Sequence, residues 1–329
     1  MNRSKMLSIL TIGVFIMSVL SLSGIALAEE HYATIFKGKP GSGGGSMPQT
    51  IPWGIERVNA VTAQQAVDES GVNVAILDTG LDFNHEDLQG LFVWGYSFYK
   101  GNRAISGQEC TPASYSACKD GHGHGTHVAG TIAAQDNSVG VLGVAPQVNL
   151  YILKVLSDRG SGSYSAIANG IITATNGPDG VPGTADDADV ISMSLGGPSG
   201  TTELENAVNY ALNNGVVVVA ATGNDGASSP SYPAAYPGVL KVGAIDSSNT
   251  IAYFSNRGED VFAPGVDVLS TTPGNNYESW SGTSMATPHV AGVVALAIAA
   301  HPTYSNTQIF NLVVSTTDGF NVVDASAVV

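Results

Sequence analysis

The sequence predicts an α/β fold with three layers, α/β/α, around a mostly parallel central sheet. Short runs rich in valine and isoleucine recur along the chain, at 72–77, 148–153, 190–195, 216–221 and 239–242. Continuous apolar runs of this length indicate strands that are buried on both faces. Segments with helical spacing or helix-compatible composition lie between them, at 126–134, 164–175 and 203–213. This alternation of strand and helix is typical of a parallel sheet covered by helices on both faces.

Composition excludes several classes of partner. The chain has 329 residues, of which 43% are hydrophobic, so it can bury a large core. It carries 27 acidic against 12 basic residues, a formal net charge of -15. A surface with this excess of negative charge repels phosphate groups, so we expect no binding to nucleic acid or to an anionic membrane.

The N-terminus has the pattern of a signal peptide. Arg3 and Lys5 precede an apolar run at 6–22, and the small-residue sequence at 26–28 stands directly before two glutamates. This order of charged, apolar and small residues predicts a signal peptide over 1–28. An uncleaved membrane anchor is the alternative, because the apolar stretch approaches the length of a span. Cleavage fits the small residues better, so we expect a secreted, extracellular protein with no stable membrane association afterwards.

The folded domain is expected to cover residues 48–329. Residues 29–47 are interpreted as a short flexible or processed lead, because the glycine and serine run at 41–46 has no side chains that can enter a core. Cys110 and Cys118 are the only cysteines. Oxidation is allowed in an exported chain, so we predict a disulfide between them.

Three segments carry residues suited to nucleophilic catalysis. Asp78 follows the first apolar run, His124 opens a glycine-rich segment, and Ser284 lies late in the chain. Active sites of parallel sheets lie at the carboxyl ends of the strands, where Asp78 is expected. A serine hydroxyl is a weak nucleophile unless an imidazole takes its proton and a carboxylate orients that imidazole. Asp78, His124 and Ser284 are therefore predicted to be the orienting acid, the general base and the nucleophile.

The same segments resemble a known family. Residues 74–80 (VAILDTG), 124–130 (HGTHVAG) and 282–289 (GTSMATPH) look like the three active-site signatures of the subtilisin-like serine proteases, the subtilases, in the chain order Asp, His, Ser. The sequence looks closest to the calcium-dependent subtilisins of hyperthermophilic archaea of the Thermococcus type. The resemblance implies a subtilisin-like fold and a secreted, monomeric serine endopeptidase that cleaves polypeptides through an acyl-enzyme. Subtilases are also made as zymogens with a long prodomain, whereas only about 29–46 lies between signal and domain here.

The resemblance further implies residues that stabilise the oxyanion and bind substrate. Asn224 ends the apolar segment 220–224 and would donate to the oxyanion; an ordinary turn asparagine is the alternative. Two segments would pair with an extended substrate as flanking strands: Gly160, Ser161 and Gly162, and Ser194, Leu195, Gly196 and Gly197. Their glycines allow close backbone approach, although each segment read alone also fits a loop whose glycines serve turns only.

Structural calcium is the metal that the resemblance implies. Six residues match the family's high-affinity calcium site, with Gln135 and the two valines contributing backbone carbonyls: Gln49, Asp87, Gln135, Asn137, Val139 and Val141. All would offer the hard oxygen donors that calcium prefers. A second candidate is the acidic loop with Asp179, Asp186, Asp187 and Asp189. A solvated acidic loop without an ion is the alternative for this second group.

Two other functions remain open at this point. His122, His124 and His127 suggest a zinc-dependent hydrolase, but neighbouring glycines interrupt the helix that such a site needs, and no glutamate base is close. A catalytically inactive, peptide-binding relative is the other alternative. It would be expected to lack a triad residue, and all three are present.

Overall fold

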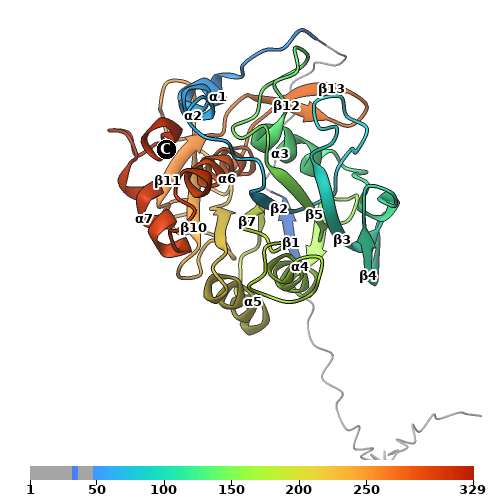
Figure 1. The fold of residues 1–329 in the computed structure, drawn as a ribbon. Coiled ribbons are helices and arrows are strands. Elements are labelled where there is room, and N and C mark those ends of the chain that lie inside the picture. Colours follow the sequence, from blue (N-terminus) through green and yellow to red (C-terminus); the bar gives the residue numbers. More distant parts are fainter. Residues whose placement is uncertain (1–31, 36–46) are drawn as a thin grey trace, which may run out of the picture.

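The structure is a computed structural model that describes residues 32–35 and 47–329 (Figure 1). The expected signal peptide lies outside these residues. The described helices are α1 (Trp53–Arg57), α2 (Ala60–Gln64), α3 (His124–Ala133), α4 (Tyr164–Asn176), α5 (Thr202–Asn213), α6 (Thr283–Ala300) and α7 (Asn306–Ser315), with 3-10 turns η1 (Ser116–Cys118) and η2 (Ala325–Ala327). The described strands are β1 (Tyr32–Ile35), β2 (Asn73–Asp78), β3 (Phe92–Lys100), β4 (Arg103–Cys110), β5 (Asn149–Lys154), β6 (Ser161–Ser163), β7 (Val190–Met193), β8 (Leu195–Gly196), β9 (Val217–Ala221), β10 (Leu240–Ile245), β11 (Val261–Pro264), β12 (Val268–Thr272) and β13 (Asn276–Trp280).

The central sheet has eight strands in the order β11-β10-β9-β7-β2-β5-β3-β4. Its neighbouring strands are parallel except for the β3–β4 hairpin at one edge. The predicted mostly parallel sheet is therefore confirmed. The chain adds β5 on one side of β2 and later adds β7 on the other side. The strand order thus reverses at β2, and such a switch point leaves a crevice at the carboxyl ends of the strands.

Two cores on opposite faces of the sheet make the three layers. Val74 and Ile76 of β2 belong to a core with residues of α3 and α6, whereas Ala75 and Leu77 belong to a core with residues of α4 and α5. Successive side chains of a strand point to opposite faces, so one strand serves both cores. In Figure 1, α4 and α5 lie together at the lower side and α3 and α6 lie above them. Among the described residues, α6 alone is long and apolar enough to cross a membrane, and 83% of it is buried inside the protein.

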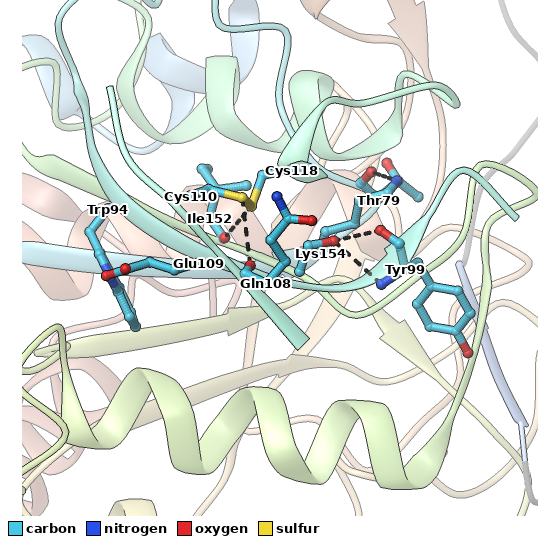
Figure 2. The surroundings of a disulfide bond; sticks show 10 residues. Thr79, Trp94, Tyr99, Gln108, Glu109, Cys110, Cys118, Ile152 and Lys154 are labelled. Carbon is cyan, nitrogen blue, oxygen red and sulfur yellow. Dashed lines mark hydrogen bonds between the residues drawn. A yellow bond between two sulfur atoms is a disulfide. The ribbon is translucent and has the colours of Figure 1, made fainter. Parts of the chain in front are cut away.

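The predicted strand 190–195 is divided in the structure. β7 ends at Met193, and after Ser194 the residues Leu195–Gly196 form β8 in a separate three-stranded sheet of order β6-β1-β8. The β3–β4 hairpin was not predicted, because β4 is largely exposed and has no continuous apolar run. β4 ends at Cys110, which is bonded to Cys118 of η1 (Figure 2). The predicted disulfide is confirmed.

Candidate active site

The three predicted triad residues lie at the ends of three elements. Asp78 is the last residue of β2, His124 the first of α3, and Ser284 the second of α6. All three are buried. Nδ1 of His124 lies 2.8 Å from Oδ1 and 2.9 Å from Oδ2 of Asp78. A carboxylate can only accept, so Nδ1 carries the proton and Nε2 is left as the basic nitrogen.

Ser284 is hydrogen-bonded to the segment that follows β7. Its hydroxyl donates to the carbonyl of Ser194 at 2.9 Å, and the Ser194 hydroxyl donates to the carbonyl of Ser284 at 2.8 Å. Pro288 explains the second bond, because proline has no N–H and the helix cannot supply the usual partner for the carbonyl four residues before it. Nε2 of His124 is buried without a hydrogen-bond partner within residues 32–35 and 47–329. The basic nitrogen is therefore available to a proton donor.

Asn224 lies beside the start of α6. Its Oδ1 accepts from the backbone N–H of Thr283 at 2.9 Å and from the Thr283 hydroxyl at 2.8 Å. A backbone N–H can only donate, so the amide oxygen must face Thr283 and the amide nitrogen must point away. In this orientation Nδ2 of Asn224 is left as a donor. The side chain is held by Thr283, the residue directly before Ser284.

A strand from the lead separates the two predicted substrate segments. β1 pairs antiparallel with β6 on one side and with β8 on the other, with Thr34 opposite both Ser161 and Gly196. The backbones at Ser161–Ser163 and Leu195–Gly196 thus accept an extended strand between them. Gly197 takes no part, because its N–H and carbonyl each form a 2.9 Å bond with Tyr232.

The glycines of the first substrate segment also have structural reasons. Gly160 adopts a φ of +75°, which side chains rarely allow. A Cβ added to Gly162 would lie 2.2 Å from the carbonyl oxygen of Val155. The fold therefore requires glycine at both positions whether or not substrate binds there.

The six predicted calcium ligands meet in one place. Residues 48–50 pair with the loop 139–141 through bridges from Pro48 to Val139 and from Thr50 to Val141. Asp87 Oδ2 accepts from the N–H of Val141 at 2.8 Å, and Oδ1 accepts from Nδ2 of Asn137 at 3.1 Å. Nε2 of Gln49 donates to the carbonyl of Gln135 at 2.8 Å. Three segments distant in the sequence thus share one cluster of oxygen donors.

The chemistry of this cluster fits a hard cation. Asp87 is fully buried, and no Lys, Arg or His forms a salt bridge with it among the described residues. Burial raises the pKa of the Asp87 carboxyl, because the charged form is poorly solvated there. Its present partners are the amide of Asn137, the hydroxyl of Tyr277 and the backbone N–H of Val141, which are neutral and offset this cost only in part.

The acidic loop divides into two parts. Ligand atoms of Asp179, Asp186 and Asp187 lie within 4.8 Å of one another. Asp189 does not join them, because its Oδ2 accepts from the backbone N–H of Asn73 at 2.8 Å. Backbone N–H groups of the loop already bond to the cluster, such as Gly183 to Asp187 at 2.5 Å. These bonds would also hold the loop without an ion.

The three histidines do not form a metal site. Nε2 of His127 lies 3.1 Å from the carbonyls of Val268 and Glu278, so that nitrogen carries a proton and donates. The rings of His122 and His124 are 6.3 Å apart, and Nδ1 of His124 is used by Asp78. In the part of the chain that the structure describes, only the aspartate cluster brings together ligand atoms of three His, Cys, Asp or Glu side chains. The zinc alternative has no support.

Sequence reasoning missed two residues around His124. Asp120 is buried and accepts hydrogen bonds from the start of α3; its place four residues before His124 in a glycine-rich loop was the available signal. Trp280 stacks on His127 with ring centroids 4.6 Å apart and lies 6.3 Å from His124. No sequence pattern pointed to Trp280, because β13 reaches α3 only through the tertiary fold.

Comparisons with known proteins agree with this geometry. Residues 69–327 match the model of the subtilase family. The chain is 46% identical over 275 residues to subtilisin amylosacchariticus of Bacillus subtilis subsp. amylosacchariticus, covering 82% of this chain and 66% of that relative. It is 49% identical over 276 residues to subtilisin DY of Bacillus licheniformis, covering 82% of this chain and 92% of that relative. Alkaline elastase YaB of Bacillus sp. (strain YaB) is 50% identical over 266 residues, covering 80% of this chain and 64% of that relative.

Two consequences follow from these relatives. All three are bacterial, so the expected special likeness to archaeal subtilisins of the Thermococcus type is not supported. The chain spans slightly less than two thirds of the length of the first of them, 66%. Family membership rests on the matched residues themselves, which include all three predicted triad positions. This chain belongs to the subtilase family.

Proposed function

We propose that this chain is a secreted serine endopeptidase that hydrolyses peptide bonds in polypeptides. Ser284 is the nucleophile, His124 the general base, and Asp78 the residue that orients His124. The observation that carries the proposal is the bond from Nδ1 of His124 to both oxygens of the buried Asp78. It leaves Nε2 basic at the end of the sheet where α6 presents Ser284.

The chemistry proceeds in two halves. The Ser284 hydroxyl turns from the Ser194 carbonyl toward Nε2 of His124 and transfers its proton there as Oγ attacks the scissile carbonyl carbon. The negative charge formed on the carbonyl oxygen is stabilised by Nδ2 of Asn224 and by the backbone N–H of Ser284. His124 then gives its proton to the departing amine, which leaves an acyl-enzyme. In the second half a water molecule takes the place of the Ser284 hydroxyl as nucleophile, again with His124 as base. The acyl group leaves as a carboxylic acid and the Ser284 hydroxyl is restored.

Substrate binds as an extended strand between β6 and β8. The place that β1 takes between these strands supports this proposal, because the same backbone groups would pair with a substrate. It also gives the lead 29–47 a role. The lead blocks the groove until it is displaced or removed, and residues 48–329 form the catalytic domain. The signal peptide at 1–28 directs secretion.

Calcium is the structural ion in this proposal. Gln49, Asp87 and Asn137 hold it with side-chain oxygens, and the carbonyls of Gln135, Val139 and Val141 complete the set. For Asn137 this requires the amide to turn so that its oxygen faces the ion. A bound ion supplies the positive charge that the buried carboxylate of Asp87 otherwise lacks. The acidic loop at 179–187 is a second, weaker candidate. The triad chemistry uses no metal.

The test is active-site labelling together with casein hydrolysis by the purified protein. A fluorophosphonate should label one serine, identified as Ser284 by peptide mapping, and labelling should abolish hydrolysis. Ser284→Ala is the matched control, expected to fold, to resist labelling and to lack activity. Hydrolysis that persists in Ser284→Ala would exclude the serine mechanism. A wild-type protein that neither labels nor cleaves would instead indicate a peptide-binding relative.

A further inference from the structure

The disulfide holds a segment that lies directly against the turn after Asp78. The N–H of Leu81 donates to the carbonyl of Cys118, and the N–H of Asp120 donates to the carbonyl of Leu81, both at 3.0 Å. The approach is close, because a Cβ added to Gly80 would lie 2.3 Å from the carbonyl oxygen of Cys118. Residues 118–120 and 78–81 therefore form one packed unit.

Asp120 connects this unit to the helix that carries His124. Its Oδ1 accepts from the Thr79 hydroxyl at 2.9 Å and from the N–H groups of His122 and Gly123 at 2.9 and 2.8 Å. Its Oδ2 accepts from the N–H and hydroxyl of Thr126 at 2.9 and 2.7 Å. The N–H groups at a helix start lack helical partners, and the N-cap residue of α3, Gly123, has no side chain to bond them. Asp120 therefore fixes the start of α3 to the residue that follows Asp78.

The disulfide joins the segment that contains Asp120 covalently to β4. Cys118 stands two residues before Asp120, and Cys110 ends β4, which is paired with β3 at the edge of the central sheet. Most of the residues between the two cysteines are exposed or half-buried. Figure 2 shows the bond near Ile152 of β5, with Thr79 and Lys154 to the right of the disulfide in the picture. The Lys154 ammonium also donates to the Thr79 carbonyl.

We propose that the Cys110–Cys118 disulfide positions the Asp78–His124 pair, acting through residues 118–120, and so sets the rate of the chemical step. This inference rests on the proposed serine endopeptidase function. The disulfide is a positioning element and touches neither substrate nor reacting atoms. Without it, residues 118–120 keep their hydrogen bonds but lose their covalent anchor to β4, and the start of α3 gains freedom relative to β2.

The test replaces both cysteines, Cys110→Ser with Cys118→Ser, so that no free thiol remains. Misplacing a catalytic group by about 1 Å can cost roughly a hundredfold in rate, and a looser pair should cost less. We expect kcat per fluorophosphonate-labelled site to fall about tenfold at 25 °C, with KM within twofold of the wild type. The matched control is Glu109→Ala, which removes the bond from Trp94 to the residue next to Cys110 and leaves the disulfide intact. Its kcat should stay within twofold.

A second readout separates positioning from stability. The proton between Nδ1 of His124 and Asp78 should give a low-field NMR signal in the wild type, and this signal should broaden in the double variant below its melting temperature. A double variant that melts earlier but keeps the full kcat and a sharp signal would overturn the proposal and leave the disulfide a stabilising role only. Failure of the wild type to label at Ser284 would refute the serine mechanism instead.

If the double variant does not fold, reduction of the folded wild type gives the same comparison. A dithiol transfers two electrons and two protons to the disulfide, which becomes two thiols while the reductant becomes a cyclic disulfide. Folded, reduced protein should lose kcat by the same factor and regain it on reoxidation. Unchanged kcat in reduced protein that still shows the wild-type circular dichroism would contradict the inference.

Discussion

Asp78, which ends β2, and Asp87, in the loop that follows, are both buried carboxylates, yet their partners differ. Asp78 faces the imidazole of His124 through both oxygens, whereas Asp87 faces the amide of Asn137, the hydroxyl of Tyr277 and a backbone N–H. A buried carboxylate beside an imidazole stabilises the imidazolium that forms during proton transfer. One surrounded by neutral oxygen and amide groups is suited to a cation that remains bound. We therefore expect chemistry from the first and stability from the second.

The test with the largest expected effect on the roles of the two carboxylates is to replace each aspartate by asparagine. Asp78→Asn should lower kcat by roughly 10⁴-fold with little change in melting temperature, because the amide can hold the wrong imidazole tautomer; that magnitude is known from other serine proteases. Asp87→Asn should leave kcat within about twofold. Steady-state kinetics and thermal unfolding of both variants test the pair. A large loss of kcat in Asp87→Asn would mean that Asp87 also contributes to the chemistry and that both carboxylates belong to one functional site.

The oxyanion donor should give the next largest effect. Asn224→Ala removes the free amide nitrogen and should lower kcat by roughly 10²- to 10³-fold with KM nearly unchanged, a magnitude that comes from subtilisin itself. Asn224→Asp is the matched variant, since it keeps an oxygen toward Thr283 but offers no amide donor. Both should lose activity alike. If Asn224→Asp were fully active, the side chain would serve only to hold Thr283.

The lead provides a third test, on the substrate side of the active site. Deleting residues 29–46 from the secreted protein should increase the initial rate of hydrolysis of small peptide substrates, because β1 no longer fills the space between β6 and β8. A synthetic peptide with the sequence of residues 32–35 should restore competitive inhibition. The control is a peptide of the same composition in scrambled order. Equal rates with and without the lead would mean that β1 leaves the groove unaided.

Calcium should affect stability with little effect on chemistry. An ion that binds only the folded state at a hundredfold excess over Kd stabilises by about 2.7 kcal/mol. Chelation should therefore lower the melting temperature of the Ser284→Ala protein, a background that prevents self-digestion. Asp87→Asn in that background should reproduce most of the loss. Superimposable unfolding curves with calcium and with chelator would remove calcium from the proposal.

Another buried group, His289, should contribute to the loss of stability at acid pH. Burial lowers the pKa of His289 from 6.5 to about 4, and its Nε2 has no hydrogen-bond partner among the described residues. As pH drops, the unfolded chain binds this proton before the folded protein does. The free energy of unfolding therefore falls by about 3 kcal/mol between about pH 6.5 and about pH 4. Denaturant unfolding of the Ser284→Ala protein across this range measures the loss. His289→Asn retains a donor to Met285 without the titration, and an equally steep profile in that variant would assign the effect elsewhere.

The sequence alone determined the layers of the fold and predicted the residues of the proposed triad. Both depend on local patterns, since a strand buried on two faces must be apolar throughout and a nucleophile needs a base and an acid of defined type. The runs at 72–77 and 148–153 differ from β2 and β5 by one residue at each end. The disulfide also followed from local information, because the chain has two cysteines and no others.

Tertiary structure decided how these parts meet. It moved residues 195–196 out of the central sheet, separated Asp189 from the other acidic residues, and turned His127 toward two carbonyls. It also placed β1 between the predicted substrate strands and Asp120 beside Thr79. None of these contacts leaves a period or a motif in the sequence. Each joins segments that are brought together only when the sheet and the helices that cover it have packed.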